Sequence, residues 1–242
     1  MIYAGILAGG VGRRMGAEMP KQFLEIAGRP IIIHTLERFM ANPRFEKIFV
    51  ATVVDYMDYL RELMAKFLPA DPRVTIIEGG ADRNGSIEAI TLAARADDPE
   101  EKCAVLVHDA ARPFVSDQTI EDSIDAVLEY GAMSAAIPAQ DTIMRSEEEG
   151  RITSVPIRSQ MFLEHSPQGF FADYFIEDYG KTTPEQRKTM TDSTALMAAA
   201  GRYVRIVASD PFNIKITTPF DLVMGEAIAM ERARERAQEN RE

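Results

Sequence analysis

The chain has 242 residues, of which 46% are hydrophobic and 27% are charged, a composition typical of a globular protein with a sizeable core. Its formal net charge of −11 argues against a nucleic-acid binder, because such a protein needs a basic surface to displace counterions. No apolar stretch reaches the roughly 18 residues that span a bilayer, no basic region precedes the first apolar segment, and the single cysteine, Cys103, excludes an internal disulfide. We therefore expect a cytoplasmic protein that binds neither nucleic acid nor membrane.

The first half of the chain alternates strand-like runs with helical patterns. Short apolar runs predict strands at 2–8, 47–53, 74–77, 104–107 and 132–137. Amphipathic segments predict helices at 31–40, 55–67, 85–95 and 117–129, the last opened by Ser116 as its cap. Strands that alternate with helices imply right-handed crossovers. The pattern predicts an α/β protein with a doubly wound, mainly parallel sheet covered on both faces.

The alternation breaks at residues 141–165. This segment is polar and carries an acidic run, Glu147-Glu148-Glu149-Gly150, between two β-rich stretches, which fits a protruding hairpin arm better than a helix. Its stretch RITSVPIRSQMF holds apolar residues that an isolated arm leaves in water, whereas docking on a second subunit would bury them. We expect one domain over residues 1–242 with residues 139–166 as a dimerisation arm; a plain surface excursion is the alternative.

The rest of the chain returns to regular structure. Its patterns predict helices at 172–180, 192–200 and 219–237 and a strand at 203–207. Before the last helix lies NIKIT, a short β-like stretch in which Lys215 stands between two isoleucines and so points to the opposite face. That lysine either reaches a phosphate or faces solvent.

The stretch AGILAGGVGRRMGAEMPKQ, residues 4–22, leads from the first strand into a glycine-rich loop. Glycines let backbone N–H groups approach phosphate oxygens that a Cβ would hold away. The dinucleotide fingerprint fails because Met15 stands where its third glycine belongs, and the Walker pattern is absent. A nicotinamide-dependent oxidoreductase is therefore a weak alternative, and a purely structural turn is another.

Cations close to this loop favour a phosphate ligand. Arg13, Arg14 and Lys21 follow the glycines in an otherwise acidic protein. Arginine forks and a lysine charge bind phosphate oxygens and stabilise charge on a leaving pyrophosphate. The loop is therefore a candidate triphosphate site.

A carboxylate far along the chain is the second signal. The stretch VLVHDAARPF places Asp109 just past an apolar strand, at the edge where ligands bind in open parallel sheets. A carboxylate there can hold Mg²⁺ or a ribose hydroxyl, or it can cap a turn. The preceding His108 is more typical of a structural residue.

Six motifs occur together in this chain: LAGGVGRRM…PKQF, GGADRNGSI, VHDAARPF, SPQGF, TDS and NIKIT. In this order they resemble the CTP-dependent cytidylyltransferases that act on sugar-alcohol phosphates. That family includes the methylerythritol phosphate enzyme of isoprenoid synthesis and the ribitol 5-phosphate enzyme of cell-wall polymer (teichoic acid) synthesis. The resemblance implies a nucleotidyltransferase fold in which the polyol phosphate attacks the α-phosphorus of CTP, pyrophosphate leaves, and Mg²⁺ bridges the phosphates.

The resemblance also implies roles for individual residues. The triphosphate would lie against Gly10, Gly12, Arg14 and Lys21, with the last two as catalytic cations. The nucleoside would meet Ala8, Gly9, Gly80, Arg83 and Ser86. Asp109, backed by Arg112, would hold the ribose or the metal. Lys215 would be a third catalytic cation and would engage the acceptor phosphate. Thr142 and Arg158 would contact the acceptor from a neighbouring subunit, and Thr191 would be a further acceptor contact.

Differences between the two branches of the family bear on the acceptor. Leu7-Ala8-Gly9-Gly10 replaces the Pro-Ala-Ala-Gly usual in methylerythritol enzymes, and GGADRNGSI and PIRSQMF resemble the ribitol branch. HDAARP and TDSTAL resemble the methylerythritol branch, and Ser166 stands where both usually have Thr, a change that keeps the hydroxyl. We expect ribitol 5-phosphate as the acceptor, with 2-C-methyl-D-erythritol 4-phosphate as the alternative. A non-catalytic nucleotide-binding protein is a remote alternative.

Overall fold

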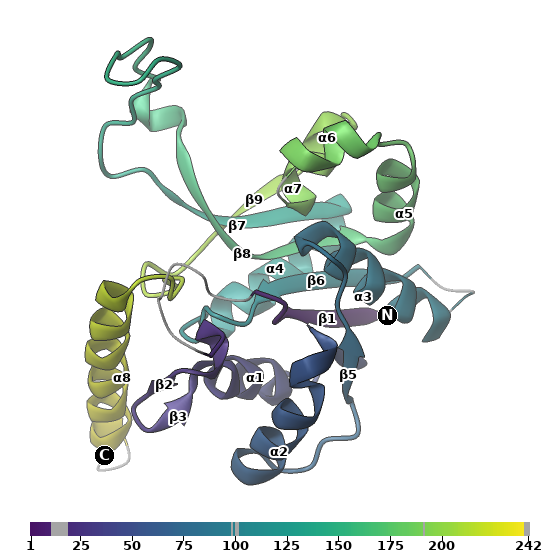
Figure 1. Ribbon diagram of the computed structural model, residues 1–242, viewed down its shortest axis with the longest axis vertical. Coiled ribbons are helices and arrows are strands. Elements are labelled where there is room, and N and C mark those ends of the chain that lie inside the picture. The colour runs from purple at the N-terminus through teal and green to yellow at the C-terminus, as the bar shows by residue number, and fades with distance from the viewer. Residues whose placement is uncertain (11–18, 98, 100–101, 191, 240–242) are drawn as a thin grey trace.

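A seven-stranded sheet forms the centre of the computed structural model (Figure 1), which describes residues 1–10, 19–97, 99, 102–190 and 192–239. The strand order is β5-β4-β1-β6-β8-β7-β9. The strands are β1 (Ile2–Leu7), β4 (Lys47–Thr52), β5 (Val74–Glu78), β6 (Ala104–Asp109), β7 (Ala132–Pro138), β8 (Phe162–Phe171) and β9 (Arg205–Ala208). A separate two-stranded hairpin joins β2 (Glu25–Ile26) to β3 (Arg29–Pro30).

The sheet is parallel except at one strand. β1 pairs in parallel with β4 and β6, β4 with β5, and β7 with β9. β8 runs antiparallel to both of its neighbours, β6 and β7. The predicted mainly parallel sheet is therefore confirmed. The parallel strands β1, β4, β5 and β6 end at one edge of the sheet, where a ligand can reach the loops that follow them.

Helices cover both faces of the sheet, so the doubly wound class is confirmed. The α-helices are α1 (Ile31–Ala41), α2 (Met57–Phe67), α3 (Arg83–Asp97), α4 (Asp117–Tyr130), α5 (Ala172–Gly180), α6 (Pro184–Thr189), α7 (Ser193–Ala199) and α8 (Pro219–Glu239). Short 3₁₀ turns cover η2 (Lys21–Phe23), η3 (Val54–Tyr56) and η4 (Arg158–Gln160). As predicted, Ser116 caps α4, because its side chain accepts the N–H of Thr119.

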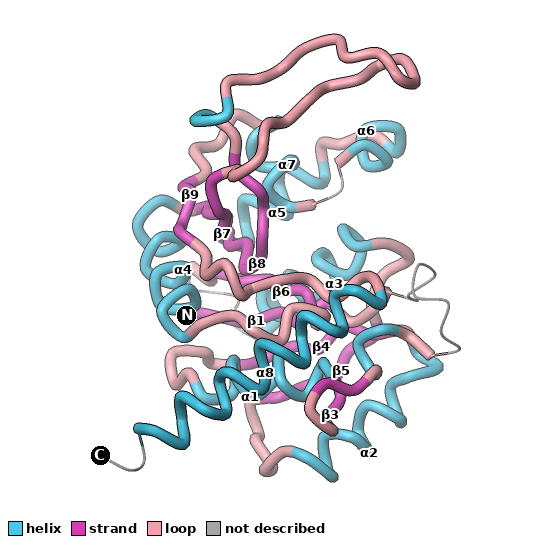
Figure 2. Tube along the Cα trace, turned by 90° about the vertical axis from the view of Figure 1, so that its left-hand side faces the viewer, coloured by secondary structure: helices cyan, strands magenta, loops and turns pink. Residues whose placement is uncertain are grey.

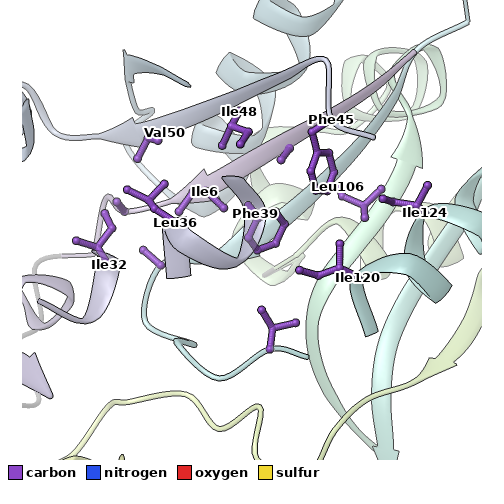
Figure 3. Close-up of a cluster of buried hydrophobic side chains, with 14 of the residues drawn as sticks. Ile6, Ile32, Leu36, Phe39, Phe45, Ile48, Val50, Leu106, Ile120 and Ile124 are labelled. Carbon is purple, nitrogen blue, oxygen red and sulfur yellow. The ribbon is translucent and has the colours of Figure 1, made fainter. Parts of the chain in front are cut away.

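Alternation along the strands divides the core between two faces. Ala4 and Ile6 of β1 point to one face, where they join a buried cluster with residues of α1, α2 and α4. Figure 3 shows this cluster around Ile6, Leu36 and Phe39. Tyr3 points to the other face and packs with α3, α5 and α7. This period of two is what a strand buried on both faces requires, and it accounts for the near-continuous apolar sequence of β1.

A long excursion leaves the sheet between β7 and β8. Residues 139–161 extend away from the body of the molecule (Figures 1 and 2), and isolated bridges join Arg145 to Ser154 and Glu148 to Arg151. This confirms the protruding arm. Residues 162–166, which the sequence analysis assigned to the arm, begin β8 instead. The reason is that β8 pairs along β7 from Phe162 onward and so carries the chain back into the sheet.

One further expectation needs correction, and three elements of the structure were not predicted. NIKIT is not a strand: the structure holds it as an irregular segment through the N–H of Ile216, which donates to the carbonyl of Ala111. SPQGF was not predicted as a strand, yet it lies in β8, because its backbone pairs with the fully buried β6. The β2–β3 hairpin and α6 were also missed, since each is too short for periodicity to show.

α8 lies at one side of the molecule beside the β2–β3 hairpin, and a third buried cluster joins them: Ile26, Ile31, Phe114, Ile216 and Ile228. In the part of the chain that the structure describes, no helix combines the length and the apolar character that a bilayer crossing requires.

Candidate active site

A pocket of about 300 Å³ opens at the carboxyl edge of the sheet. Its walls are the loop after β1, the turn η2, the loop between β5 and α3, the end of β6 and the segment before α8. The lining residues are Leu7, Gly9, Gly10, Lys21, Gln22, Gly80, Ala81, Asp82, Arg83, Ser86, Asp109, Ala110, Ala111 and Lys215. The pocket thus brings together eight of the residues proposed from sequence, although they come from five separate stretches of chain.

Asp109 is the electrostatic centre of this pocket. Its carboxylate lies 2.8 Å from the Lys215 ammonium and 3.5 Å from the guanidinium groups of both Arg83 and Arg112. Burial alone raises the pKa of this carboxyl group, but the three cations outweigh it and hold the pKa well below its usual range. One carboxylate among three cations leaves an excess of positive charge, which suits a polyanionic ligand.

Other parts of the fold fix the arginines. The Arg112 guanidinium is buried and donates to the carbonyl of Asn213 at 2.7 Å, which ties β6 to the segment before α8. The Arg83 guanidinium donates to Oε1 of Gln168 at 3.1 Å, and Ser193 donates to the same oxygen at 2.8 Å. Both cations are therefore held in place before any ligand binds.

The described part of the fold leaves room for a side chain at two glycines of the pocket, Gly9 and Gly10. A Cβ on Gly9 would meet only Ser86 Oγ, at 3.7 Å, and a Cβ on Gly10 would meet no described atom within 4 Å. Neither backbone has a positive φ. Open space beside these two backbones would let a ligand approach them closely.

Gly80 is a glycine for a different reason. A Cβ there would lie 2.3 Å from the carbonyl carbon of Gly85, so the loop can cross the first turn of α3 only without a side chain. Ser86 Oγ accepts the N–H of Gly80 at 3.1 Å and donates to the carbonyl of Asp82 at 3.0 Å. This network presents the N-terminal end of α3 to the pocket, a position that favours anions.

Ala8 is not among the residues that line the pocket. It is almost fully buried, its N–H donates to the carbonyl of Ala51, and its carbonyl accepts from Gln22 Nε2 at 2.6 Å. These hydrogen bonds fix the start of the glycine loop, and the nucleoside role expected for Ala8 stays a prediction. Gln22 was overlooked as a candidate although it stands in the quoted PKQF motif.

Several proposed residues are not in this pocket. Gly12, Arg14 and Thr191 lie outside the described residues, as does Arg13. Thr142 and Arg158 are exposed on the arm, where Arg158 donates to the carbonyl of Gln140 at 3.2 Å. Within one chain, then, the structure does not bring the two arm residues to Asp109.

The donors present fit a metal that is shared with a ligand. Among the described residues no group of three or more His, Cys, Asp or Glu side chains could hold a metal ion by itself. Asp109 and Asp82 are the carboxylates that line the pocket. Mg²⁺ usually takes one or two carboxylates together with substrate phosphates and water. Asp109 could therefore hold Mg²⁺ in company with nucleotide oxygens.

A doubly wound sheet with one antiparallel strand, a glycine loop after β1 and a cationic pocket around Asp109 defines an α/β nucleotidyltransferase. The profile of one family, 2-C-methyl-D-erythritol 4-phosphate cytidylyltransferase (IspD), matches residues 2–231. The chain belongs to this family, and the predicted CTP-dependent cytidylyltransferase is confirmed.

Solved structures agree with that assignment. The 2-C-methyl-D-erythritol 4-phosphate cytidylyltransferase from Thermus thermophilus is 30% identical, with a TM-score of 0.72 over 95% of this chain and 100% of that one. The Francisella tularensis enzyme of the same name is 26% identical, with a TM-score of 0.75 over 92% and 97%. The fold is also similar to 4-diphosphocytidyl-2C-methyl-D-erythritol synthase from Anaerococcus prevotii, at 24% identity and a TM-score of 0.78 over 95% and 96%. These findings favour the methylerythritol alternative over the expected ribitol acceptor.

Proposed function

We propose that this protein transfers CMP from CTP to 2-C-methyl-D-erythritol 4-phosphate. An oxygen of the acceptor phosphate forms a bond to the α-phosphorus of CTP, the bond between the α- and β-phosphates breaks, and pyrophosphate leaves. Family membership supports the choice of acceptor. The observation that carries the proposal is the carboxylate of Asp109 among three cations at the carboxyl edge of the sheet.

The described residues divide between the two substrates. Gly9 and Gly10 would admit the triphosphate to the backbone, and Lys21 would neutralise charge on the leaving pyrophosphate. The start of α3, with Arg83 and Ser86, would receive the nucleoside side. Because positioning and charge neutralisation drive phosphoryl transfer, these residues need form no covalent intermediate.

Lys215 would change partners during this reaction. In the ligand-free chain its ammonium neutralises Asp109 at 2.8 Å. Asp109 would hold Mg²⁺ together with nucleotide oxygens, and the bound metal would supply positive charge to this carboxylate and to the triphosphate. Lys215 is then available for the phosphate of the acceptor, which is the role expected from sequence.

We further propose that two copies of the chain exchange their arms. The arm exposes Met144, Ile152, Val155 and Ile157, each more than half accessible. A second exposed apolar set lies next to Lys215 and on the first turns of α8: Phe212, Phe220, Val223 and Met224. Burying both sets in a dimer would remove this apolar surface from water. The same arrangement would bring Thr142 and Arg158 to the neighbouring pocket.

A product assay with two acceptors tests the proposed function. The purified protein is given CTP and Mg²⁺ with either 2-C-methyl-D-erythritol 4-phosphate or ribitol 5-phosphate, and pyrophosphate and the CDP-linked product are both measured. We expect kcat/KM for the methylerythritol phosphate to exceed that for ribitol phosphate by at least about 100-fold, the scale of discrimination that specific hydrogen bonds to substrate hydroxyls provide. A preference for ribitol 5-phosphate would reverse the acceptor assignment, and no product with either would contradict the proposal.

A further inference from the structure

His108 lies directly behind the pocket without lining it. It is the residue before Asp109 in β6, and its side chain is completely buried. Its Nδ1 is 2.9 Å from Ser166 Oγ, and its Nε2 is 3.1 Å from the carbonyl oxygen of Arg112. The imidazole of His108 thus contacts Ser166, which is hydrogen-bonded to Asp109, and the backbone carbonyl of Arg112.

The partners of the ring determine the direction of each hydrogen bond. The carbonyl of Arg112 can only accept, so Nε2 carries the hydrogen. Complete burial favours the neutral ring, which leaves Nδ1 as an acceptor. The Ser166 hydroxyl therefore donates to Nδ1, and its oxygen accepts the backbone N–H of Asp109 at 3.1 Å.

This chain of hydrogen bonds begins where the pairing of β6 with β8 ends. The last paired residues there are Val107 and Gln168, and the preceding residue of β8, Pro167, has no N–H to donate. At this point the Ser166 hydroxyl oxygen, in place of a backbone group of β8, accepts the hydrogen bond from the N–H of Asp109. The turn then closes as the N–H of Arg112 donates to the carbonyl of Asp109 at 3.0 Å. His108 consequently fixes both ends of the turn 109–112.

We propose that His108 is a positioning residue for the nucleotide site. Through Ser166 it sets the backbone of Asp109, and through the Arg112 carbonyl it sets the end of the same turn. The Arg112 guanidinium thereby stays 3.5 Å from the Asp109 carboxylate. The ring itself touches no substrate. The inference rests on the proposed role of Asp109 in holding Mg²⁺ and CTP. A purely structural ring, packed on Phe39 at 5.0 Å between centroids, would affect stability alone.

Matched variants separate positioning from packing. Ser166→Ala removes the hydroxyl, and Ser166→Thr keeps it. His108→Gln can retain a donor toward the Arg112 carbonyl but loses the acceptor for Ser166, whereas His108→Asn can retain that acceptor. We expect Ser166→Ala and His108→Gln each to raise the Mg²⁺ concentration for half-maximal turnover about 10- to 100-fold, as loss of groups that orient a metal ligand does. Ser166→Thr should stay within a few-fold of the wild type, and His108→Asn should lose less than His108→Gln.

Two readouts do not depend on turnover. In the ligand-free protein, NMR amide exchange should be faster at Asp109 in Ser166→Ala than in the wild type, because that N–H has lost its acceptor. Calorimetric titration with CTP and Mg²⁺, without acceptor, should show weaker binding in the same variant. The double variant Ser166→Ala/His108→Gln should lose no more than the worse single variant, since the two side chains act in one chain.

Specific results would overturn the proposal. One is unchanged exchange at Asp109 together with unchanged Mg²⁺ dependence in Ser166→Ala; another is losses that multiply in the double variant. If the His108 variants do not fold, the Ser166→Ala and Ser166→Thr pair decides by the same measurements. Asp109→Asn distinguishes a failure of the proposed nucleotide role of Asp109 from a failure of the positioning role of His108. If that variant is fully active, the nucleotide role of Asp109 fails, while amide exchange still tests whether His108 and Ser166 fix its backbone.

Discussion

At the residue scale, the pocket gathers positive charge in a protein whose net charge is −11. Lys215, Arg83 and Arg112 surround Asp109, and Lys21 lines the same pocket. Three cations so close together would repel one another without a counterion, and the Asp109 carboxylate among them supplies it. Under the proposed function, these cations would receive the phosphates of CTP.

Lys21→Ala tests the role of the cation nearest the glycine loop. We expect turnover to fall about 100-fold or more, because a preorganised group that stabilises transition-state charge contributes on that scale. The melting temperature should change little, since one partly exposed lysine adds little to stability. Steady-state kinetics with CTP and acceptor provide the measurement. Lys181→Ala, at an exposed lysine that follows the C-terminal end of α5, is the control. Near-normal turnover in Lys21→Ala would exclude Lys21 from the site.

Gly10→Ala tests whether the loop glycines serve the ligand. A Cβ at this position meets no described atom within 4 Å, so the free energy of unfolding should stay close to the wild-type value. KM for CTP should rise about 5-fold or more, because a methyl group that obstructs a close contact costs about 1–3 kcal/mol and about 1.4 kcal/mol is tenfold. Gly180→Ala, at another glycine with open surroundings, is the matched control. An unchanged KM for CTP would contradict the ligand role of Gly10 and favour a purely structural turn.

At the element scale, sequence patterns predict the elements that fill the core and miss those that tertiary pairing creates. Strand β1 and helix α4 follow from apolar runs, helical period and a Ser116 cap, all of which are local. β8 does not, because SPQGF has no alternating pattern and becomes a strand only by pairing with β6. NIKIT shows the opposite case: its alternation resembles a strand, but the segment is irregular and holds to the turn after β6 through the N–H of Ile216, which donates to the carbonyl of Ala111.

In the candidate site, too, sequence motifs identify some residues, whereas others depend on contacts that only the tertiary fold creates. Motif order was sufficient to propose Asp109, Lys215 and Arg83, and all three line the pocket. The hydrogen bonds of the Ala8 backbone to Ala51 and Gln22 could not be predicted, because a motif does not indicate which backbone groups the fold itself uses. Gln168, which orients Arg83, could be identified only once β8 was placed beside the pocket.

Arg158→Ala tests the arm. If this residue reaches the pocket of a second copy, KM for the acceptor should rise about 10-fold or more while KM for CTP changes little, since a hydrogen bond to a charged group contributes about 1.5–3 kcal/mol. Steady-state kinetics at varied concentrations of each substrate give both constants. Arg151→Ala, at an exposed position near the tip of the same arm, is the control. A larger effect on CTP than on the acceptor would contradict the assignment.

At the scale of the whole molecule, two histidines make stability depend on pH. Burial lowers the pKa of His108 and of His165 to about 4, from an ordinary value of 6.5. The unfolded chain therefore takes up protons below pH 6.5 that the folded chain refuses until about pH 4. Stability consequently falls as the pH drops through this window.

Urea unfolding at intervals between pH 7 and pH 4 measures this loss. The fully buried His108 should contribute up to about 1.4 kcal/mol per pH unit, and His165 should act in the same direction. Carboxyl groups with lowered pKa values, such as Asp71, lose their contribution only at lower pH. A free energy of unfolding that stays level from pH 6.5 to pH 4.5 would be incompatible with neutral buried histidines.

The central claim for the whole molecule is that the pocket around Asp109 binds CTP, and a crystal structure of the protein with CTP and Mg²⁺ tests it most directly. We expect the triphosphate beside Gly9, Gly10 and Lys21 and the ribose or the metal at Asp109. Lys215 should have moved from its position 2.8 Å from that carboxylate. CTP bound elsewhere, for instance in the larger groove lined by Arg29, Arg38 and Arg73, with the Asp109–Lys215 pair undisturbed, would contradict it.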